Sequence, residues 1–148
     1  MKIYLGADHN GFDFKKGIAQ FLHNAGYEAV DVSGPDFNKD DDFPQFASKA
    51  VSALLSDADK TSKAILICGS GQGMCMAANR FNGIRASLCW NLEEARAARN
   101  DDDSNVLCLS SSYSSLDDLK PIIMAWLNTP FAGAPRFVRR IQQLDKLK

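Results

Sequence analysis

The residues best suited to chemistry stand together in the run Cys68-Gly69-Ser70-Gly71-Gln72-Gly73. Its three glycines allow the backbone to turn its N–H groups inward around a small anion. The apolar run 64–67 before it predicts a buried strand, and an apolar, helix-forming stretch follows from Met74. A thiol beside an anion-binding turn and a helix N-terminus is where a reactive thiolate is most easily stabilised. The pattern therefore predicts chemistry on a small phosphorylated or oxyanion-forming molecule.

Three familiar glycine-rich templates do not fit this turn. A dinucleotide fingerprint would place its last glycine at Met74, and it normally follows the first strand of a domain. A nucleoside-triphosphate P-loop needs a Gly-Lys-Ser/Thr sequence, which the turn lacks. A cysteine phosphatase loop needs an arginine where Met74 stands. What remains is a short nest with Cys68 at its rim, or else an inert thiol buried at the end of a strand.

Charged residues elsewhere in the chain are further candidates for substrate contact. Asp8 and His9 directly follow the first strand-like run, where an aspartate can alternatively serve only as a helix cap. Arg136 and Arg140 are four positions apart, so they project from one side of a helix and can clamp a phosphate, although such arginines often form a solvated face. The run 101–103 contains three aspartates, and its default interpretation is a solvated loop.

The rest of the sequence alternates strand-like and helix-like segments. Short apolar runs predict strands at 2–6, 27–32, 64–68, 84–88 and 106–109. Helical spacing of apolar residues predicts helices at 14–25, 46–55, 74–79, 93–99, 119–126 and 137–144. This alternation predicts an α/β three-layer sandwich with a Rossmann-like, five-stranded parallel sheet and an extra C-terminal helix, suited to packing on a neighbouring subunit. Ligands of such sheets bind beyond the carboxyl ends of the strands, where Asp8, His9 and Cys68 fall.

Composition narrows the class of protein further. A length of 148 residues with 45% apolar residues fits one globular domain spanning 1–148. The net charge of −1 gives no electrostatic case for nucleic acid or a membrane surface, and no apolar stretch approaches the roughly 20 residues that span a bilayer. The sequence shows no signal-peptide pattern, and its four unpaired cysteines favour reduced thiols in a cytoplasmic protein. The only histidines, His9 and His23, lie far from any paired cysteines, which argues against zinc.

Taken together, these residues resemble the type B ribose-5-phosphate isomerases and the related galactose-6-phosphate isomerase subunits. The resemblance covers nearly the whole chain, and several motifs in register are more specific than one glycine loop. The motifs are Gly6-Ala7-Asp8-His9-Asn10-Gly11 with Lys15, Asp42-Phe43-Pro44 with Ala47, the Cys68 to Gly73 run, Ala77-Ala78-Asn79-Arg80, Gly83-Ile84-Arg85-Ala86, Asn105-Val106-Leu107, and Arg136 with Arg140.

The resemblance implies an aldose–ketose isomerisation of a sugar phosphate, with no metal or organic cofactor, and foremost the interconversion of ribose 5-phosphate and ribulose 5-phosphate in the pentose phosphate pathway. Cys68 would be the base that removes the proton next to the carbonyl, and Ser70 would shuttle a proton between the two sugar oxygens. The turn would stabilise the enediolate. Substrate contacts would come from Asp8, His9, Phe43, Gly69, Gly71, Gln72, Gly73 and Asp102, and phosphate contacts from Arg136 and Arg140.

The same resemblance implies a homodimer, or a dimer of dimers, with active sites shared between subunits. Three positions depart from the family pattern. Asp101 stands where a histidine usually opens the sugar ring as a general acid, Ser112 replaces a common arginine, and Phe43 a frequent tyrosine. We hypothesise that Asp101 takes over as the acid, because adjacent carboxylates raise one another's pKa. The alternative hypotheses are that the ring opens in solution or that the preferred sugar phosphate differs.

Two other functions stay open on the sequence alone. One is isomerisation of another pentose or hexose phosphate, such as allose or galactose 6-phosphate. The other is a non-catalytic protein that binds a sugar phosphate on the same fold. The altered acid segment and the missing arginine favour this binding protein, whereas the intact Cys68 and its glycine turn favour an enzyme.

Overall fold

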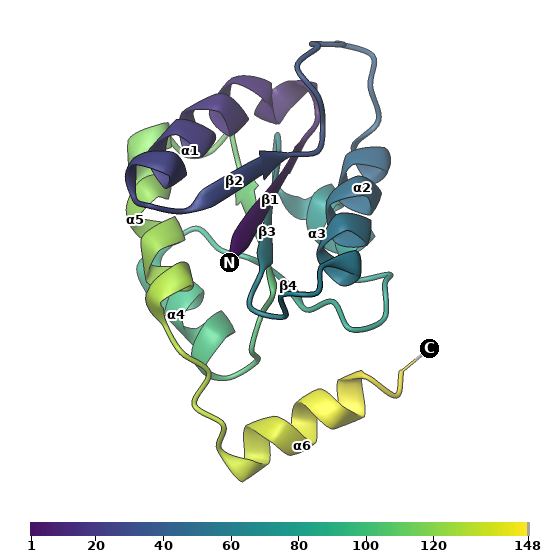
Figure 1. The fold of residues 1–148 in the computed structure, drawn as a ribbon, viewed down its shortest axis with the longest axis vertical. Coiled ribbons are helices and arrows are strands. Elements are labelled where there is room, and N and C mark those ends of the chain that lie inside the picture. Colours follow the sequence, from purple (N-terminus) through teal and green to yellow (C-terminus); the bar gives the residue numbers. More distant parts are fainter. Residues whose placement is uncertain (148) are drawn as a thin grey trace.

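The strand-like segments of the chain form one parallel sheet. The computed structural model describes residues 1–147, and its sheet has the strand order β2-β1-β3-β5-β4 with every neighbouring pair parallel (Figure 1). The strands are β1 (Lys2–Ala7), β2 (Glu28–Asp31), β3 (Lys63–Cys68), β4 (Ala86–Leu88) and β5 (Val106–Ser110). The helices are η1 (His9–Gly11), α1 (Phe12–Asn24), α2 (Phe43–Ser56), α3 (Gln72–Ala78), α4 (Leu92–Asn100), α5 (Leu116–Asn128) and α6 (Pro135–Leu144). The predicted α/β fold is confirmed.

Helices cover both faces of the sheet, which makes three layers. On one face α1, α4 and α5 pack on residues such as Ile3, Leu5 and Ile65. On the other face α2 and α3 pack on Tyr4 and Leu66. Because both faces are covered, successive residues of the central strands are all buried, and such strands read as unbroken apolar runs. This burial is the reason why β1, β3 and β5 are recognisable in the sequence.

Most elements begin or end one to three residues away from the predicted bounds, and two of these differences have a clear local cause. The strand expected from residue 84 begins only at Ala86, because the Arg85 N–H donates to the side chain of Asn105 at 2.9 Å instead of a strand carbonyl. Helix α2 begins at Phe43, three residues earlier than expected. Pro44 occupies its first turn, where a missing N–H group costs no helical hydrogen bond. The earlier start brings Phe43 towards the carboxyl edge of the sheet.

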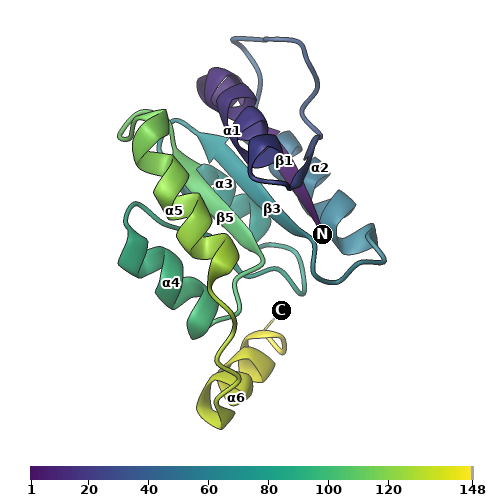
Figure 2. The same cartoon turned by 60° about the vertical axis from the view of Figure 1, so that its left-hand side comes forward.

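Helix α6 stands apart from the three-layer sandwich. Both views place it beyond the end of the sheet where β1 begins, connected to α5 by an extended segment (Figures 1 and 2). Phe137 is its only buried residue, while Val138 and Leu144 on the same helix are 37% and 49% exposed. A helix with so much apolar surface in contact with water is typical of one that packs on another subunit. Within residues 1–147, no helix is long and apolar enough to cross a membrane.

A buried ammonium group fixes the long loop between β2 and α2. Lys15 of α1 is 1% exposed, and its Nζ lies 2.8 Å from Asp31 Oδ2 at the end of β2. The same Nζ donates to the carbonyl oxygen of Gly34 at 2.7 Å. Since a buried charge is stable only when it is paired, this contact determines how the chain leaves β2 on its way to Asp41 and Phe43.

The Lys15–Asp31 pair gives a test of this anchoring role. We expect Asp31→Ala to destabilise the protein by about 2–3 kcal/mol, because it leaves the Lys15 ammonium buried without its carboxylate. Lys15→Met costs less, because it removes the charge and leaves Asp31, whose side chain is 37% exposed, to be solvated by water. Urea unfolding followed by circular dichroism measures both variants. No loss of stability in either variant would contradict the anchoring role.

Candidate active site

The thiol of Cys68 lies against the turn that follows it. Cys68 is the last residue of β3 and is 5% exposed, and the N–H of Gly71 donates to its Sγ at 3.2 Å. Within residues 1–147, no acceptor is found for the N–H groups of Ser70, Gly73 and Met74. The turn therefore holds one N–H on the sulfur and offers others to a ligand.

Two glycines of this turn are closely packed. Gly71 has φ of 76°, and a Cβ atom there would lie 2.5 Å from the Leu88 side chain and 3.0 Å from the Leu109 carbonyl oxygen. A Cβ atom at Gly73 would lie 2.8 Å from the ring of Phe43. A left-handed conformation and close packing both favour glycine at position 71. The Phe43 ring, 37% exposed, consequently lies directly over the turn.

The segment after β5 braces the thiol turn from the neighbouring strand. The Ser111 N–H donates to the carbonyl oxygen of Cys68 at 3.0 Å, and the Ser110 hydroxyl donates to that of Gly69 at 2.7 Å. The Ser112 N–H donates to the same Gly69 carbonyl oxygen at 2.9 Å. Ser112, which replaces an arginine of the family pattern, thus lies inside the candidate site. These bracing serines were not predicted from the sequence, because their role depends on β5 lying next to β3.

Asp8 and His9 lie on the same edge of the sheet. The Asp8 carboxylate is 5% exposed and accepts hydrogen bonds from the N–H groups of Asn10 and Gly11 at 3.0 and 3.1 Å. Burial raises its pKa above the ordinary value. Asp8 therefore caps η1, the structural role considered above, while it remains beside the turn. The Asn10 side chain reaches across to Gly69, with its Cγ 3.6 Å from where a Cβ atom of Gly69 would lie.

His9 is held by a carboxylate that sequence reasoning missed. Its Nδ1 lies 2.7 Å from Asp41 Oδ1, and its backbone N–H donates to the same oxygen at 3.0 Å. The hydrogen bond to Asp41 is the main reason why the pKa of His9 is raised above its ordinary value. Asp41 belongs to the acidic run 40–42, which by composition alone resembles a solvated loop. No local signal links it to a residue 32 positions earlier.

The remaining predicted site residues lie at the opposite edge of the sheet. Helix α4 runs back from the carboxyl end of β4, so Asp101 and Asp102 precede the amino end of β5. Arg85, just before β4, donates from Nε to the carbonyl oxygen of Asp102 at 2.9 Å. Cys68 and its partner Ser110 lie at the other end of these strands, four residues and therefore about 13 Å beyond the Ala64–Val106 pair at the usual rise per residue. One chain therefore does not bring Asp101 or Asp102 to Cys68.

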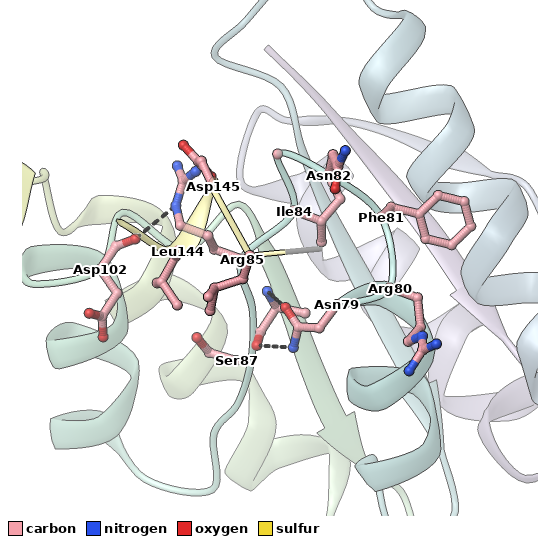
Figure 3. Close-up of a pocket in the computed structure, with 13 residues that line it drawn as sticks. Asn79, Arg80, Phe81, Asn82, Ile84, Arg85, Ser87, Asp102, Leu144 and Asp145 are labelled. Carbon is pink, nitrogen blue, oxygen red and sulfur yellow. Dashed lines mark hydrogen bonds between the residues drawn. The ribbon is translucent and has the colours of Figure 1, made fainter. Parts of the chain in front are cut away.

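Arg136 and Arg140 share this distant location on α6. Both side chains are exposed, and their guanidinium carbons lie 4.4 and 5.9 Å from the centre of the Phe137 ring. The two arginines thus flank one aromatic ring, as expected from their helical spacing. A cavity of about 660 Å³ separates the end of α6 from the segment 79–87 and Asp102. Figure 3 shows Leu144, the last residue of α6, and Asp145 just after it facing this segment across the cavity.

The triple aspartate is not a cluster of three uncompensated charges. Asp103 pairs with Arg85 at 2.9 Å and with Arg99 at 2.8 Å. Its backbone has φ of 46°, which turns the chain sharply into β5. Two arginines therefore compensate the charge of this carboxylate. That Asp101 acts as the ring-opening acid stays a prediction.

The other cysteines are also free thiols, and they lie outside the turn. Cys89 and Cys108 are buried, and burial raises the pKa of Cys89 to about 12 and that of Cys108 well above its ordinary value. The pKa of Cys75 on α3 falls to about 7, mainly through a hydrogen bond from Cys108. In the part of the chain that the structure describes, no three His, Cys, Asp or Glu side chains gather as metal ligands.

Comparison with known proteins gives a single family. The model of the family described as Ribose/Galactose Isomerase matches residues 3–144. The chain belongs to this family. Ribose-5-phosphate isomerase B of Mycolicibacterium paratuberculosis is 34% identical over 97% of this chain and 89% of the relative, and that of Escherichia coli is 35% identical over 99% and 96%. The family resemblance inferred from the sequence is thereby confirmed.

Solved structures of family members agree with the isomerase fold of this chain. The ribose-5-phosphate isomerase B of Clostridium thermocellum has a TM-score of 0.92 at 38% identity, covering 99% of this chain and 96% of that one. The enzyme of Mycoplasma genitalium, solved with bound ribulose 5-phosphate, has a TM-score of 0.92 at 36% identity and covers 98% and 94%. This chain therefore shares its fold with these isomerases over nearly its whole length.

The glycine turn of this isomerase gives a matched pair of substitutions. Gly71→Ala and Gly83→Ala both place alanine at a positive φ, 76° and 79°, which costs about 1–2 kcal/mol each. Only position 71 adds a clash, since a Cβ atom at Gly83 meets nothing closer than 3.9 Å. We expect Gly71→Ala to be the less stable by about 1–3 kcal/mol in urea unfolding and to lose isomerase activity. Equal stability of the two variants would show that the turn tolerates a side chain.

Proposed function

We propose that this isomerase-family chain interconverts ribose 5-phosphate and ribulose 5-phosphate, with Cys68 as the carbon-acid base. The observation that carries the proposal is the Cys68 sulfur held at 3.2 Å by the Gly71 N–H, beside N–H groups that have no acceptor in residues 1–147. A relative of the same fold is solved with bound ribulose 5-phosphate, and this supports the choice of substrate. The four free thiols suit the reducing cytoplasm, where we place the protein.

The reaction needs a base at carbon and donors for a developing oxyanion. The Cys68 thiolate takes the proton from the carbon next to the carbonyl, and the electron pair moves onto the carbonyl oxygen. N–H groups from Gly69 to Gly73 stabilise this oxyanion in the enediolate. The Ser70 hydroxyl moves a proton between the two sugar oxygens, and the Cys68 thiol returns its proton to the neighbouring carbon. The reaction is a proton transfer in two steps, and the N–H groups of the turn stabilise the negative charge that develops between them.

We further propose that each active site takes residues from two subunits. The thiol half-site contains Asp8, His9, Phe43, Cys68 and the turn 69–73, all at the carboxyl edge. The phosphate half-site contains Asp101, Asp102, Arg136 and Arg140, and lies at the other edge and on α6. Since one chain separates the two half-sites by the length of the sheet, a two-fold dimer is the simplest assembly that joins them.

Removal of the Cys68 thiol tests the catalytic part of the proposal. We expect Cys68→Ala to lower kcat for ribose 5-phosphate by about 10²–10⁴-fold, the contribution of a positioned general base, while calorimetry still detects ligand binding. Cys75→Ala is the matched control, because it removes another partly buried thiol outside the turn and should leave kcat unchanged. Full activity in Cys68→Ala would eliminate the assigned base.

A small substrate panel separates the competing functions. Ribose 5-phosphate, allose 6-phosphate and galactose 6-phosphate are each incubated with the wild-type protein, and formation of the ketose is measured. Highest kcat/KM on one of the hexose phosphates would make this chain an isomerase for that sugar. Binding without turnover of any aldose phosphate would favour the non-catalytic binding protein, for which the altered positions Asp101 and Ser112 argue.

Mixed oligomers test whether the sites are shared. In a two-fold dimer of Cys68→Ala with an Arg136→Ala/Arg140→Ala chain, one site collects both defects and the other collects none. Random pairing of these two inactive chains should therefore recover about a quarter of wild-type activity. Co-expression of Cys68→Ala with Ser70→Ala is the control, because both changes fall in the thiol half-site and no intact site can form. Recovery in the control, or none in the first mixture, would contradict the assignment.

A further inference from the structure

His9 contacts the carboxylate of Asp41 in the way expected for an imidazole that donates a proton. Its Nδ1 and its backbone N–H both bond Asp41 Oδ1, at 2.7 and 3.0 Å, so one oxygen fixes the ring and the main chain together. The Asp41 side chain is only 8% exposed, whereas the His9 side chain is 31% exposed. The second ring nitrogen, Nε2, lies 2.9 Å from the Asn10 amide nitrogen, and the Asn10 side chain lies against Gly69. The Nε2 side of the ring consequently lies next to Asn10, on the side of the thiol turn.

We propose that His9 is the acid that opens the sugar ring in this protein, and that Asp41 is the positioning residue that equips it for this role. The inference rests on the function proposed above, and it adds a second residue pair to the reaction. Aldose phosphates with five or more carbons exist mainly as rings, so an isomerase that uses them at speed needs a proton donor before Cys68 can act. Of the chain's two histidines, His23 belongs to the end of α1, remote from the carboxyl edge of the sheet.

The ring-opening step balances with water as the second partner. The bond between the ring oxygen and the anomeric carbon breaks, and its electron pair stays on the ring oxygen, which takes the proton from His9 Nε2. The anomeric hydroxyl gives its proton to water, and the electron pair of that O–H bond completes the new carbonyl. His9 regains a proton from solvent, so no net charge accumulates. The aldehyde produced is the species whose carbon-bound proton Cys68 removes.

The Asn10 side chain can form a hydrogen bond with His9 Nε2 in both protonation states of the ring. In the structure its amide nitrogen faces Nε2, an arrangement that fits the neutral imidazole with its proton on Nδ1 towards Asp41. A half-turn of the amide presents its oxygen instead, which accepts a hydrogen bond from the Nε2–H of the charged ring. Asp41 accepts the Nδ1–H in both states, so the ring keeps its orientation when it gives up the Nε2 proton.

The charges around His9 favour its protonated form. Asp41, Asp8 and Asp40 are the charged groups that face it, and all three are acidic. Partial burial of the ring opposes them, but the direct hydrogen bond to Asp41 outweighs burial and the pKa rises. A raised pKa keeps the acid form present to higher pH, and the acid is lost as the pH passes above that pKa. Activity that depends on His9 as an acid therefore falls on the alkaline side of its titration.

The alternative donor, Asp101, is in a different position. It lies at the end of α4, at the opposite edge of the chain from His9, and its Oδ1 accepts a hydrogen bond from the Asn100 amide at 2.7 Å. This contact is local to the end of α4 and lacks the carboxylate–imidazole pairing seen at His9, so the geometry favours His9 as the donor.

Proton NMR on the imidazole rings tests the Asp41–His9 pair directly. Because the chain has two histidines, the His9 and His23 signals are readily assigned, and His23 is an internal control. We expect Asp41→Asn to lower the pKa of His9 and leave that of His23 in place. Asp40→Asn, the matched control, removes a neighbouring charge that makes no hydrogen bond to the ring in residues 1–147 and should shift His9 far less. An unchanged His9 titration in Asp41→Asn would overturn the pairing.

Kinetics then separate ring opening from the carbon-acid step. On ribose 5-phosphate near neutral pH, we expect Asp41→Asn to lose about tenfold or more in kcat/KM, with its alkaline limb moved to lower pH. Exchange of the C1 proton of ribulose 5-phosphate with D₂O serves as the comparison, since this ketose carries phosphate on the oxygen needed to close a furanose ring. That exchange uses only Cys68 and the turn, so it should stay close to the wild-type rate in Asp41→Asn.

The outcomes distinguish this inference from the proposed function. Equal losses in isomerisation and in proton exchange would overturn the role of His9 as ring-opening acid and indicate a phosphate or binding contact instead. A loss confined to isomerisation in Asp101→Asn, with Asp41→Asn unaffected, would assign the acid to Asp101. A wild-type protein that isomerises no aldose phosphate would contradict the proposed function, while the NMR titration would still decide whether Asp41 controls the protonation of His9.

Discussion

The direction of the parallel sheet is the constraint on which the rest of the molecule depends. All strands end at one edge, so the residues at and just after these ends, including Asp8 and Cys68, lie together there. The residues that precede strands gather at the other edge, and Asp101 and Asp102 belong to that group. A chain with this topology cannot bring both groups into contact. Any chemistry that uses both requires a second chain.

The sequence allowed most of the fold to be predicted, because burial on both faces leaves a strong local signal. Unbroken apolar runs revealed β1, β3 and β5, and the glycine run after Cys68 revealed the turn. The strand order was not predictable in the same way, since nothing local places β5 between β3 and β4. That order decides which loop braces Cys68, so the contacts of Ser110 to Ser112 became visible only in the structure.

The contact between His9 and Asp41 shows why a candidate site is harder to predict than a fold. Asp41 is one of three consecutive aspartates in a polar loop, and composition gives no reason to prefer it over its neighbours. Its choice follows from the buried Lys15, which binds Asp31 and the Gly34 carbonyl and thereby sets the path of that loop. A buried cation on α1 thus holds the start of the loop that supplies the partner of His9. All of these contacts join residues far apart in the sequence, so local sequence patterns do not reveal them.

The two aspartate runs of this chain have opposite electrostatic characters. In the run 101–103, Asp103 forms ion pairs with Arg85 and Arg99, so this carboxylate has a structural role in the turn before β5. In the run 40–42, Asp41 binds His9, and among the ion pairs of residues 1–147 no arginine or lysine pairs with it. A carboxylate next to an imidazole stabilises the imidazolium, which is the form that can donate. The loss of a histidine at position 101 is therefore compatible with acid catalysis, provided that the donor is supplied from the thiol edge of the sheet.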